Sequence, residues 1–354
     1  MNPLYQALPV FAQNVSCSAA GWWRGRQRFT PHFWQTLAEW EKSISFPLEE
    51  LHRIQANRLC RLIEHARRHV PALEHLPPLA IGSDPASCMQ RALSQIEPSQ
   101  KSDYRSRERD YLARNIAPRS LIRARTSGTT GSALRLWYTA DALAEEYATV
   151  WRMRRRAGVS LSDAHLTFGG RMIVPYSRRS PPFWRHDWSA SQTLFSLYHM
   201  SPSTMMDYVD AIHSTPGRYV QGYPSSLHLI ARALLHENRP LPPGRLVAVF
   251  TSSESVLDYQ RAVIERAFGA PIFDRYGASE FSASMTACPV GNLHVDMEYC
   301  IVEIETLEET SECLRGPILV TGLSNLAMPF IRYRIGDVGT KLKAPCSCGR
   351  AGDV

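Results

Sequence analysis

The sequence predicts an α/β protein in which helices flank parallel β-sheets, and three features lead to this prediction. Residues 49–72 place apolar side chains at intervals of three and four residues, which is typical of an amphipathic helix. From residue 218 onward, short apolar runs alternate with helical segments. Polar loops rich in glycine and hydroxyl side chains follow each of these apolar runs. Such alternation predicts a parallel sheet, because right-handed crossovers return each strand beside the last.

The helix predicted over 49–72 has one apolar face, formed by Leu51, Ile54, Leu59, Leu62, Ile63 and Ala66. Around it the first 120 residues read as helices and irregular turns, broken by prolines at 77, 78, 85 and 98. The later alternation gives strand 218–221, helix 226–238, strand 246–250, helix 259–268 and strand 271–276. We expect Ser225 and Asp258 to cap the two helices at their amino ends, and Gly269 to end the second.

Three polar loops follow the three predicted strands, with the sequences GYPSS (222–226), TSSES (251–255) and GASE (277–280). Carboxyl ends of neighbouring parallel strands meet at one edge of the sheet, where open α/β sheets bind their ligands. The three loops together therefore predict a ligand site.

A further loop of this kind lies in RARTSGTTGSALRLWYT, residues 123–139. Gly128 and Gly131 allow the backbone to approach a ligand closely, and the neighbouring hydroxyls are hydrogen-bond donors. The loop by itself fits either an anion-binding concavity or a flexible hairpin turn. It is not a Walker loop, since the GK[ST] ending is absent.

The amino-acid composition limits the classes of molecule that this protein is expected to bind. Forty Lys and Arg against 33 Asp and Glu give a net charge of +7, which favours anionic partners. We expect no nucleic-acid partner, because no zinc finger or helix-turn-helix pattern is present. No apolar run reaches the roughly 18 residues of a membrane span, and the amino terminus lacks a basic signal-peptide region. We therefore expect a cytoplasmic protein with no membrane partner, whose eight cysteines are buried thiols or metal ligands.

The segments TSGTTGSAL, YGASE and YRIGDVG resemble the phosphate loop, acid motif and ribose-binding motif of the adenylate-forming superfamily, in that order. WRHDWSASQTLFSLYHMS, QGYPSSLHLIA and PCSCGR resemble the phenylacetate–CoA ligase and CapK-like family, from residue 50 to the end. The resemblance implies the large amino-terminal domain of these enzymes, with a small β-barrel-like carboxyl-terminal part. It divides the chain into a helical region (1–120), a nucleotide- and acid-binding core (121–285) and a β-rich subdomain (286–354).

The resemblance implies a nucleotide site for ATP and Mg²⁺. Glu280 would bind Mg²⁺ and Asp337 the two ribose hydroxyls, while Tyr276 packs on the adenine. The remaining nucleotide-binding residues would be Ser127, Gly128, Thr129, Thr130, Gly131, Ser253, Glu254 and Gly277, with Thr130 and Glu280 acting in catalysis. Each motif residue also has a structural alternative: Asp337 as a turn residue, Glu280 as the cap of a helix beginning at Phe281, and Tyr276 as a core residue.

The segments that approach the acid in the resembled family contain Phe168, Gly169, Gly170, Tyr198, Tyr223 and Pro224. Aromatic rings stack well on a planar substrate, although they also fill protein cores. Cys288 and His294 are followed by Cys346 and Cys348, and these four would hold a structural zinc ion, as similar positions do in the resembled family. The alternative is four free buried side chains.

The resemblance implies an acid–CoA ligase type of enzyme, which activates an aromatic carboxylic acid as acyl-adenylate and releases pyrophosphate. The acceptor would be coenzyme A, a carrier protein or another enzyme, in a setting such as antibiotic (phenazine, griseoluteic acid) biosynthesis. Two departures are present: Ser132 and Ala133 replace the usual Lys-Pro, and we expect the closing carboxyl-terminal domain to be absent. Arg135 is a candidate replacement cation. The departures leave a second hypothesis, a nucleotide- or adenylate-binding protein without turnover.

Overall fold

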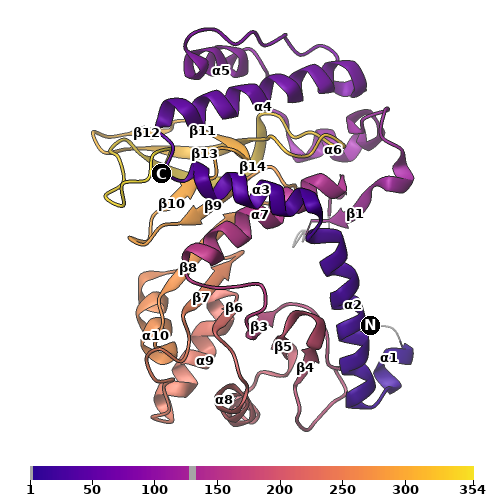
Figure 1. Cartoon of the computed structure of the whole chain (residues 1–354), viewed down its shortest axis with the longest axis vertical. Helices are drawn as coiled ribbons and strands as arrows, with labels where there is room; N and C mark the ends of the chain where they lie inside the picture. Colours follow the sequence, from indigo (N-terminus) through magenta and orange to yellow (C-terminus); the bar gives the residue numbers. More distant parts are fainter. Residues whose placement is uncertain (1–2, 127–132) are drawn as a thin grey trace. The chain divides into compact units, whose positions relative to one another are not determined.

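The structure is a computed structural model, and it describes residues 3–126 and 133–354 (Figure 1). Internal contacts divide the chain into two compact units. Unit 1 consists of Met1–Gln27 and Met153–Arg275, and unit 2 of Arg28–Arg152 and Tyr276–Val354. The division into three domains predicted from the sequence stays a prediction. Among the helices of the described ranges, none has the length and apolar character needed to cross a membrane.

Unit 1 is built on a mixed sheet whose strand order is β8-β7-β6-β3-β5-β4. All neighbouring pairs are parallel except β4 and β5, which are antiparallel. The strands are β3 (His165–Gly169), β4 (Trp184–Asp187), β5 (Gln192–Ser196), β6 (Tyr219–Gly222), β7 (Ala248–Ser252) and β8 (Ile272–Gly277), the last two residues of which belong to unit 2. The helices are α1 (Pro3–Ala7), α2 (Val10–Arg28), α8 (Met205–Ser214), α9 (Pro224–His236) and α10 (Asp258–Phe268).

The predicted alternation of strands and helices is confirmed as β6, α9, β7, α10 and β8, but both predicted helix caps are wrong. Helix α9 begins two residues earlier than expected, after the capping residue Tyr223, because Pro224 occupies its first turn and its ring favours the helical φ. Asp258 likewise lies inside the first turn of α10, after the capping residue Leu257. Gly269 ends α10 in the left-handed conformation, with φ of 62°, as predicted.

A side chain from the next loop stabilises the amino end of α9. The Ser225 backbone N–H donates to Glu254 Oε2 at 3.0 Å, and the Ser225 hydroxyl donates to Oε1 at 3.0 Å. A carboxylate at this position satisfies a free N–H group and interacts favourably with the helix dipole. The loop after β7 is thereby tied to the loop after β6.

Unit 2 combines helices with antiparallel strands. Strand β13 pairs with β11, β12 and β14, while β1–β2 and β9–β10 form two hairpins. The strands are β1 (Ile122–Arg125), β2 (Arg135–Tyr138), β9 (Ser284–Ala287), β10 (Leu293–Val295), β11 (Cys300–Ile304), β12 (Glu308–Glu309), β13 (Cys313–Gly322) and β14 (Tyr333–Leu342). The helices are α3 (Pro31–Ser43), α4 (Leu48–His69), α5 (Pro85–Ser94), α6 (Lys101–Ser106) and α7 (Ala140–Arg156), the last of which continues into unit 1.

The predicted amphipathic helix is α4, which ends at His69, and its predicted apolar face is buried except for Ile54, which is partly exposed. Figure 1 shows α4 beside the β11–β13 strands, with α5 on the other side of α4. Leu59, Leu62 and Ile63 are at most 1% exposed and share a core cluster with Ile318 and Val320 of β13. Removing these apolar surfaces from water stabilises unit 2.

One buried arginine connects three segments of unit 2. Arg152 Nη2 lies 2.6 Å from Asp296 Oδ1, and Nη1 lies 2.8 Å from Glu298 Oε1. Arg152 Nη1 also donates to the Trp40 carbonyl oxygen at 3.1 Å. All three charged side chains are at most 2% exposed. Because a buried charge needs its partners, this network fixes α3 and α7 against residues 296–298.

We predict that Arg152→Ala lowers the free energy of unfolding by about 3–5 kcal/mol, because it leaves two carboxylates buried without their counter-charge. Urea unfolding measures this loss. The matched control is Arg53→Ala, which breaks an exposed ion pair with Glu50 and should leave the stability almost unchanged. Equal, small effects of both substitutions would contradict the role of Arg152.

We predict that Glu254→Ala costs about 1 kcal/mol of stability, since the first turn of α9 loses an acceptor for Ser225. Glu254→Gln loses the favourable charge but keeps one acceptor oxygen for Ser225. It should therefore cost less stability than Glu254→Ala. Thermal unfolding of the two variants tests the order. If Glu254→Gln destabilises the protein as much as Glu254→Ala, the hydrogen bonds do not carry the effect.

Candidate functional site

The acid and ribose-binding motifs meet in unit 2 although they are far apart in the sequence. The hydroxyl of Tyr276, near the end of β8, donates to Asp337 Oδ2 at 2.6 Å. Asp337 is exposed in β14, next to a break in the register with β13 between Pro317 and Leu319. Gly336 takes a φ of +98° there, a value that glycine adopts readily. The irregularity in β14 therefore presents Asp337 to the Tyr276 side chain, and Asp337 is not an ordinary turn residue.

Glu280 lies in the turn after β8 and is only 8% exposed. Its Oε1 accepts a hydrogen bond from the Tyr333 hydroxyl at 3.5 Å. Burial raises the pKa of the Glu280 carboxyl, and burial also raises the pKa of Tyr333. No helix begins at Phe281, where the chain continues irregularly into β9, so Glu280 is not a helix cap. The buried Glu280 carboxylate is a suitable oxygen ligand for a divalent cation, and the exposed Asp337 carboxylate can accept hydrogen bonds from a nucleotide.

The hairpin β1–β2 flanks the predicted phosphate loop and contacts the turn that carries Glu280. Residues 127–131, including Thr130, lie outside the described residues. In β2, the Tyr138 hydroxyl donates to the Ser279 carbonyl oxygen at 2.5 Å, and the Tyr138 ring stacks on Phe281 with centroids 4.0 Å apart. The hairpin is therefore anchored next to Glu280.

Sequence reasoning did not single out Tyr138 or Tyr333. Tyr333 opens the YRIGDVG motif, four residues before Asp337. Tyr138 lies in the short apolar strand that follows the glycine-rich loop. Alternate residues of a strand point to opposite faces, and this alternation, which places Tyr138 on the buried face, was the available signal. Both are tyrosines whose rings are buried and whose hydroxyls reach the acid motif.

The exposed face of the β1–β2 hairpin is basic. Arg125 lies directly opposite Arg135, and Arg123 opposite Trp137, in the pairing of the two strands. These residues line a shallow pocket of about 400 Å³. Arg135 Nη2 forms an ion pair with Glu108 Oε2 at 2.6 Å, so the expected replacement cation is already partnered. Arg125 is exposed on the same face, nearer in sequence to the glycine-rich loop.

In unit 1, the predicted acid-binding residues lie at the ends of β3 and β6 and after β5. The Tyr198 hydroxyl donates to the Gly170 carbonyl oxygen at 2.9 Å. A side chain at Gly170 would meet the Tyr223 hydroxyl at 3.0 Å, so these three residues lie together. Pro224 is buried in the first turn of α9, and Gly169 ends β3. Phe168 is fully buried and stacks on Phe195, so its ring offers no surface to a ligand.

The predicted nucleotide residues of unit 1 follow β7. Ser253 is exposed and has a φ of 71°, in the left-handed region that non-glycine residues rarely adopt. Glu254 is exposed and engaged with Ser225, as described above. Gly277, at the end of β8 and within unit 2, is exposed beside Tyr276.

Cys288, His294, Cys346 and Cys348 come together in unit 2, with ligand atoms all within 4.8 Å of one another. The Sγ atoms of Cys288 and Cys346 are 3.8 Å apart, and Cys348 Sγ is 3.3 Å from His294 Nε2. A tetrahedral zinc site with Zn–S bonds of about 2.3 Å and Zn–N bonds of about 2.0 Å has edges of about 3.8 and 3.5 Å. The donor set and its spacing therefore fit zinc, and the sulfur atoms are too far apart for a disulfide.

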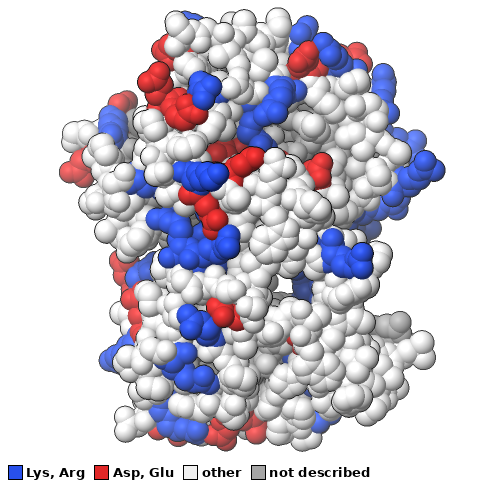
Figure 2. All heavy atoms as spheres, viewed as in Figure 1, with Lys and Arg blue, Asp and Glu red and all other residues white. Residues whose placement is uncertain are grey.

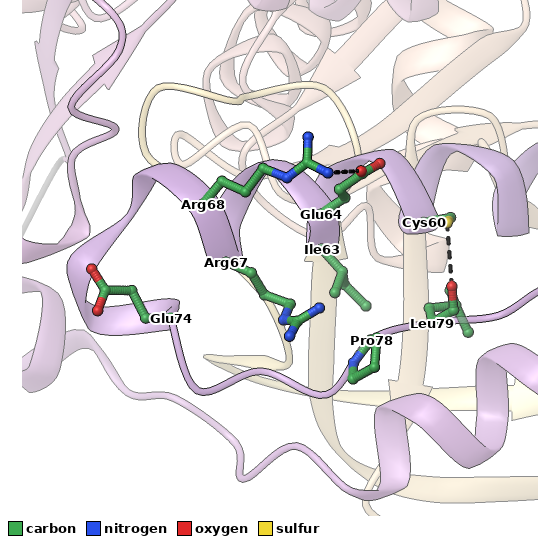
Figure 3. Close-up of a pocket in the computed structure, with 8 residues that line it drawn as sticks. All are labelled: Cys60, Ile63, Glu64, Arg67, Arg68, Glu74, Pro78 and Leu79. Atoms are coloured by element: carbon green, nitrogen blue, oxygen red, sulfur yellow. Dashed lines mark hydrogen bonds and ion pairs between the residues drawn. The ribbon is translucent and has the colours of Figure 1, made fainter.

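A separate pocket of about 490 Å³ lies between α4 and residues 74–79 (Figure 3). Figure 3 shows the Arg68–Glu64 ion pair on its rim and the Cys60 thiol hydrogen-bonded to the Leu79 carbonyl oxygen. None of the predicted site residues lines this pocket. The candidate site is therefore the group of motif residues rather than this groove.

The sequence matches no family model. The CapK protein of Staphylococcus aureus is 23% identical over 337 residues, which are 95% of this chain and 72% of CapK. Among solved structures, an open form of 2-hydroxyisobutyryl-CoA ligase with 2-HIB-AMP and CoA has a TM-score of 0.67 and 18% identity, and the match covers 88% of this chain and 75% of the ligase chain. The same ligase in its postadenylation state with R3-HIB-AMP also gives 0.67, at 17% identity, over 88% of this chain and 68% of that one. The chain is therefore similar in sequence to CapK over almost its whole length, and it has the mixed α/β fold seen in 2-hydroxyisobutyryl-CoA ligase.

Proposed function

We propose that this protein activates a carboxylic acid with ATP, forming an acyl-adenylate and releasing pyrophosphate. One observation carries the proposal: the acid motif, the ribose motif and the strand after the phosphate loop all meet around Glu280. Tyr276 contacts Asp337, Tyr333 contacts Glu280, and Tyr138 contacts Ser279. Residues up to about 200 positions apart along the chain therefore come together. The reaction needs a cation ligand, an acceptor for the ribose hydroxyls and hydrogen-bond donors for the phosphates, all held in one place.

The chain's own groups suit the two tasks of binding and orientation. Asp337 Oδ1 would accept hydrogen bonds from the ribose hydroxyls, while the Tyr276 hydroxyl donates to Oδ2. Glu280 would bind Mg²⁺, which supplies positive charge for the developing pyrophosphate. Residues 127–131 would donate hydrogen bonds to the phosphates. The acid's carboxylate then attacks the α-phosphorus in line, so no side chain is needed as a nucleophile.

We propose an aromatic acid as the substrate, in secondary metabolism. The support is the group formed by Gly170, Tyr198 and Tyr223 at the strand ends of unit 1. Gly170 allows close approach, and two tyrosine rings can stack on a planar acid. Coenzyme A is the acceptor we propose first, because the 2-hydroxyisobutyryl-CoA ligase of the same fold binds CoA together with its acyl-AMP.

We also propose that the four-residue cysteine and histidine cluster holds zinc as a structural ion. Four protein ligands close the tetrahedron and leave no position for a substrate. The Arg350 backbone N–H donates to Cys348 Sγ at 3.4 Å, and its guanidinium lies 3.3 Å from Asp296 Oδ1. The ion would therefore hold the end of the chain against the buried Arg152 network.

We predict acid-dependent pyrophosphate release, with hydroxamate formed when hydroxylamine traps the activated acyl group from a panel of aromatic acids. Asp337→Ala should lower kcat/KM about 10- to 100-fold, because hydrogen bonds to a charged group are lost. Glu280→Gln should lower it about 100-fold or more through loss of the cation. Glu309→Gln, in an exposed ion pair with Lys343, is the matched control and should leave the rate unchanged.

Adding coenzyme A distinguishes the acceptors. Without hydroxylamine, conversion of the acyl-adenylate to an acyl-CoA thioester with release of AMP supports coenzyme A, whereas acyl-adenylate that stays unconverted points to another acceptor. Unaltered rates in Asp337→Ala and Glu280→Gln would contradict the site. ATP binding without product from any acid would instead support the nucleotide-binding protein that the sequence left open, a reading favoured by Ser132 and Ala133.

We predict about one zinc ion per chain by elemental analysis of the purified protein. Cys288→Ser and Cys346→Ser should lose the zinc and unfold at lower temperature, because a ligand present at about 1,000-fold its Kd contributes about 4 kcal/mol to stability. Cys313→Ser, outside the cluster, is the control. Full stability of the zinc-free variants would contradict a structural role.

A further inference from the structure

Helix α2 packs on unit 1 with its polar side chains facing inward. Its buried residues are Gln13, Asn14 and Cys17. Gln13 Oε1 accepts from Arg185 Nε at 2.6 Å, and Asn14 Oδ1 accepts from the His186 backbone N–H at 3.0 Å. Hydrogen bonds to β4 thus satisfy these buried amides. The arrangement is the reverse of an ordinary surface helix, whose apolar stripe faces the core.

The orientation of α2 is fixed by close contact with β4. A Cβ atom added at Gly21 would lie 1.8 Å from Asp187 Oδ2, so the helix backbone lies almost against this buried carboxylate. The Ser18 hydroxyl accepts from the Trp188 N–H at 2.9 Å, which adds a third attachment. Because only glycine fits at position 21 and the amides are bonded, α2 cannot rotate to bury its apolar side.

The side of α2 facing solvent is apolar. We define the outer stripe as Leu4, Leu8, Phe11, Val15, Trp22 and Trp23, which are 77%, 38%, 70%, 45%, 54% and 60% exposed. Four of them belong to α2, with Phe11, Val15 and Trp22 on one helical face. Trp188, 53% exposed, extends the stripe by packing against Phe11 at 5.9 Å. A contiguous exposed apolar surface of this kind marks an interaction site.

Basic groups border the outer stripe, and acidic groups are absent from its segment. No Asp or Glu occurs before Glu39, whereas α2 ends with Arg24, Arg26 and Arg28. The Arg26 guanidinium lies 5.1 Å from the Trp22 ring centroid. Figure 2 shows a mostly uncharged surface over α1 and α2, with Lys or Arg side chains near the carboxyl end of α2.

The loop beside α1 continues this pattern. The Tyr5 hydroxyl donates to the Ile173 carbonyl oxygen at 2.6 Å, which places residues 171–179 next to α1. The loop carries exposed Met172 and Tyr176, 43% and 64% exposed. It also carries exposed Arg171 and Arg179. Arginines therefore follow the stripe at the carboxyl end of α2 and also occur in the loop that contacts Tyr5 of α1.

We propose that this face binds the surface of an anionic lipid bilayer, with α2 lying in the plane of the interface. Tryptophan and phenylalanine insert at the level of the headgroups, and arginines pair with anionic phosphates. A second copy of the chain fits less well, because a two-fold contact would bring the arginines of two stripes together without acidic partners. The sequence expectation of no membrane partner rested on the absence of a spanning segment, which an interfacial helix does not need.

Co-sedimentation of the full chain with vesicles of phosphatidylcholine, with and without phosphatidylglycerol, tests the proposal. We expect binding to the anionic vesicles that weakens with salt. The triple substitution Phe11→Ser, Trp22→Ser and Trp23→Ser should weaken it at least about tenfold, and Arg26→Gln about fivefold. Tyr259→Ser and Leu229→Ser, at equally exposed positions on α10 and α9, are the controls and should bind normally.

The substituted side chains are exposed, so unchanged thermal unfolding verifies that each variant is folded. Failure of the wild-type chain to bind anionic vesicles would overturn the proposal, as would equal binding by the stripe and control variants. Concentration-dependent dimers that the stripe substitutions abolish, without vesicle binding, would assign the face to a second copy and also overturn it. Pyrophosphate release in solution is a separate readout, so this result does not depend on the proposed reaction.

Discussion

The arrangement of unit 2 depends on one buried charge, that of Arg152. Its partner Asp296 also accepts hydrogen bonds from the hydroxyls of Ser284, at 2.7 Å, and Thr286, at 2.9 Å, at the start of β9. The turn that precedes β9 presents Glu280, and the hairpin that follows it carries Cys288 and His294. A buried ion pair is costly to assemble but still costlier to break, so it holds these segments in one geometry. The acid motif and the cysteine cluster thus share one anchor.

The buried carboxylate of the candidate site lowers the stability of the protein, and the interactions around it offset this loss. Glu280 is buried next to tyrosine hydroxyls, and burial disfavours its charged form. Groups of this kind persist where function needs them, because a bound cation restores the favourable interaction that burial removes. Tyr276 and Tyr333 have a complementary role: each presents one hydroxyl to one carboxylate, and their rings stay in or against the core. The rigid rings thereby position one oxygen of each carboxylate.

The sequence predicted the elements whose signals are local. The period of α4, the alternation from β6 to β8 and the glycine at the end of α10 were all readable from spacing and end signals. The two predicted helix caps were wrong because Tyr223 and Leu257, rather than Ser225 and Asp258, occupy the capping positions. Contacts such as Tyr138 with Ser279 were unreadable, since they join segments 141 residues apart. The inward polar face of α2 was also unreadable, because its partner β4 is remote in sequence.

The measurement that tests the central claim most directly is a single-turnover reaction of the chain with ATP, Mg²⁺ and each aromatic acid, quenched and analysed by mass spectrometry for acyl-AMP. The account predicts that one acid gives acyl-AMP and pyrophosphate in equal amounts, up to one per active site. ATP retained on the protein with no acyl-AMP from any acid would contradict it.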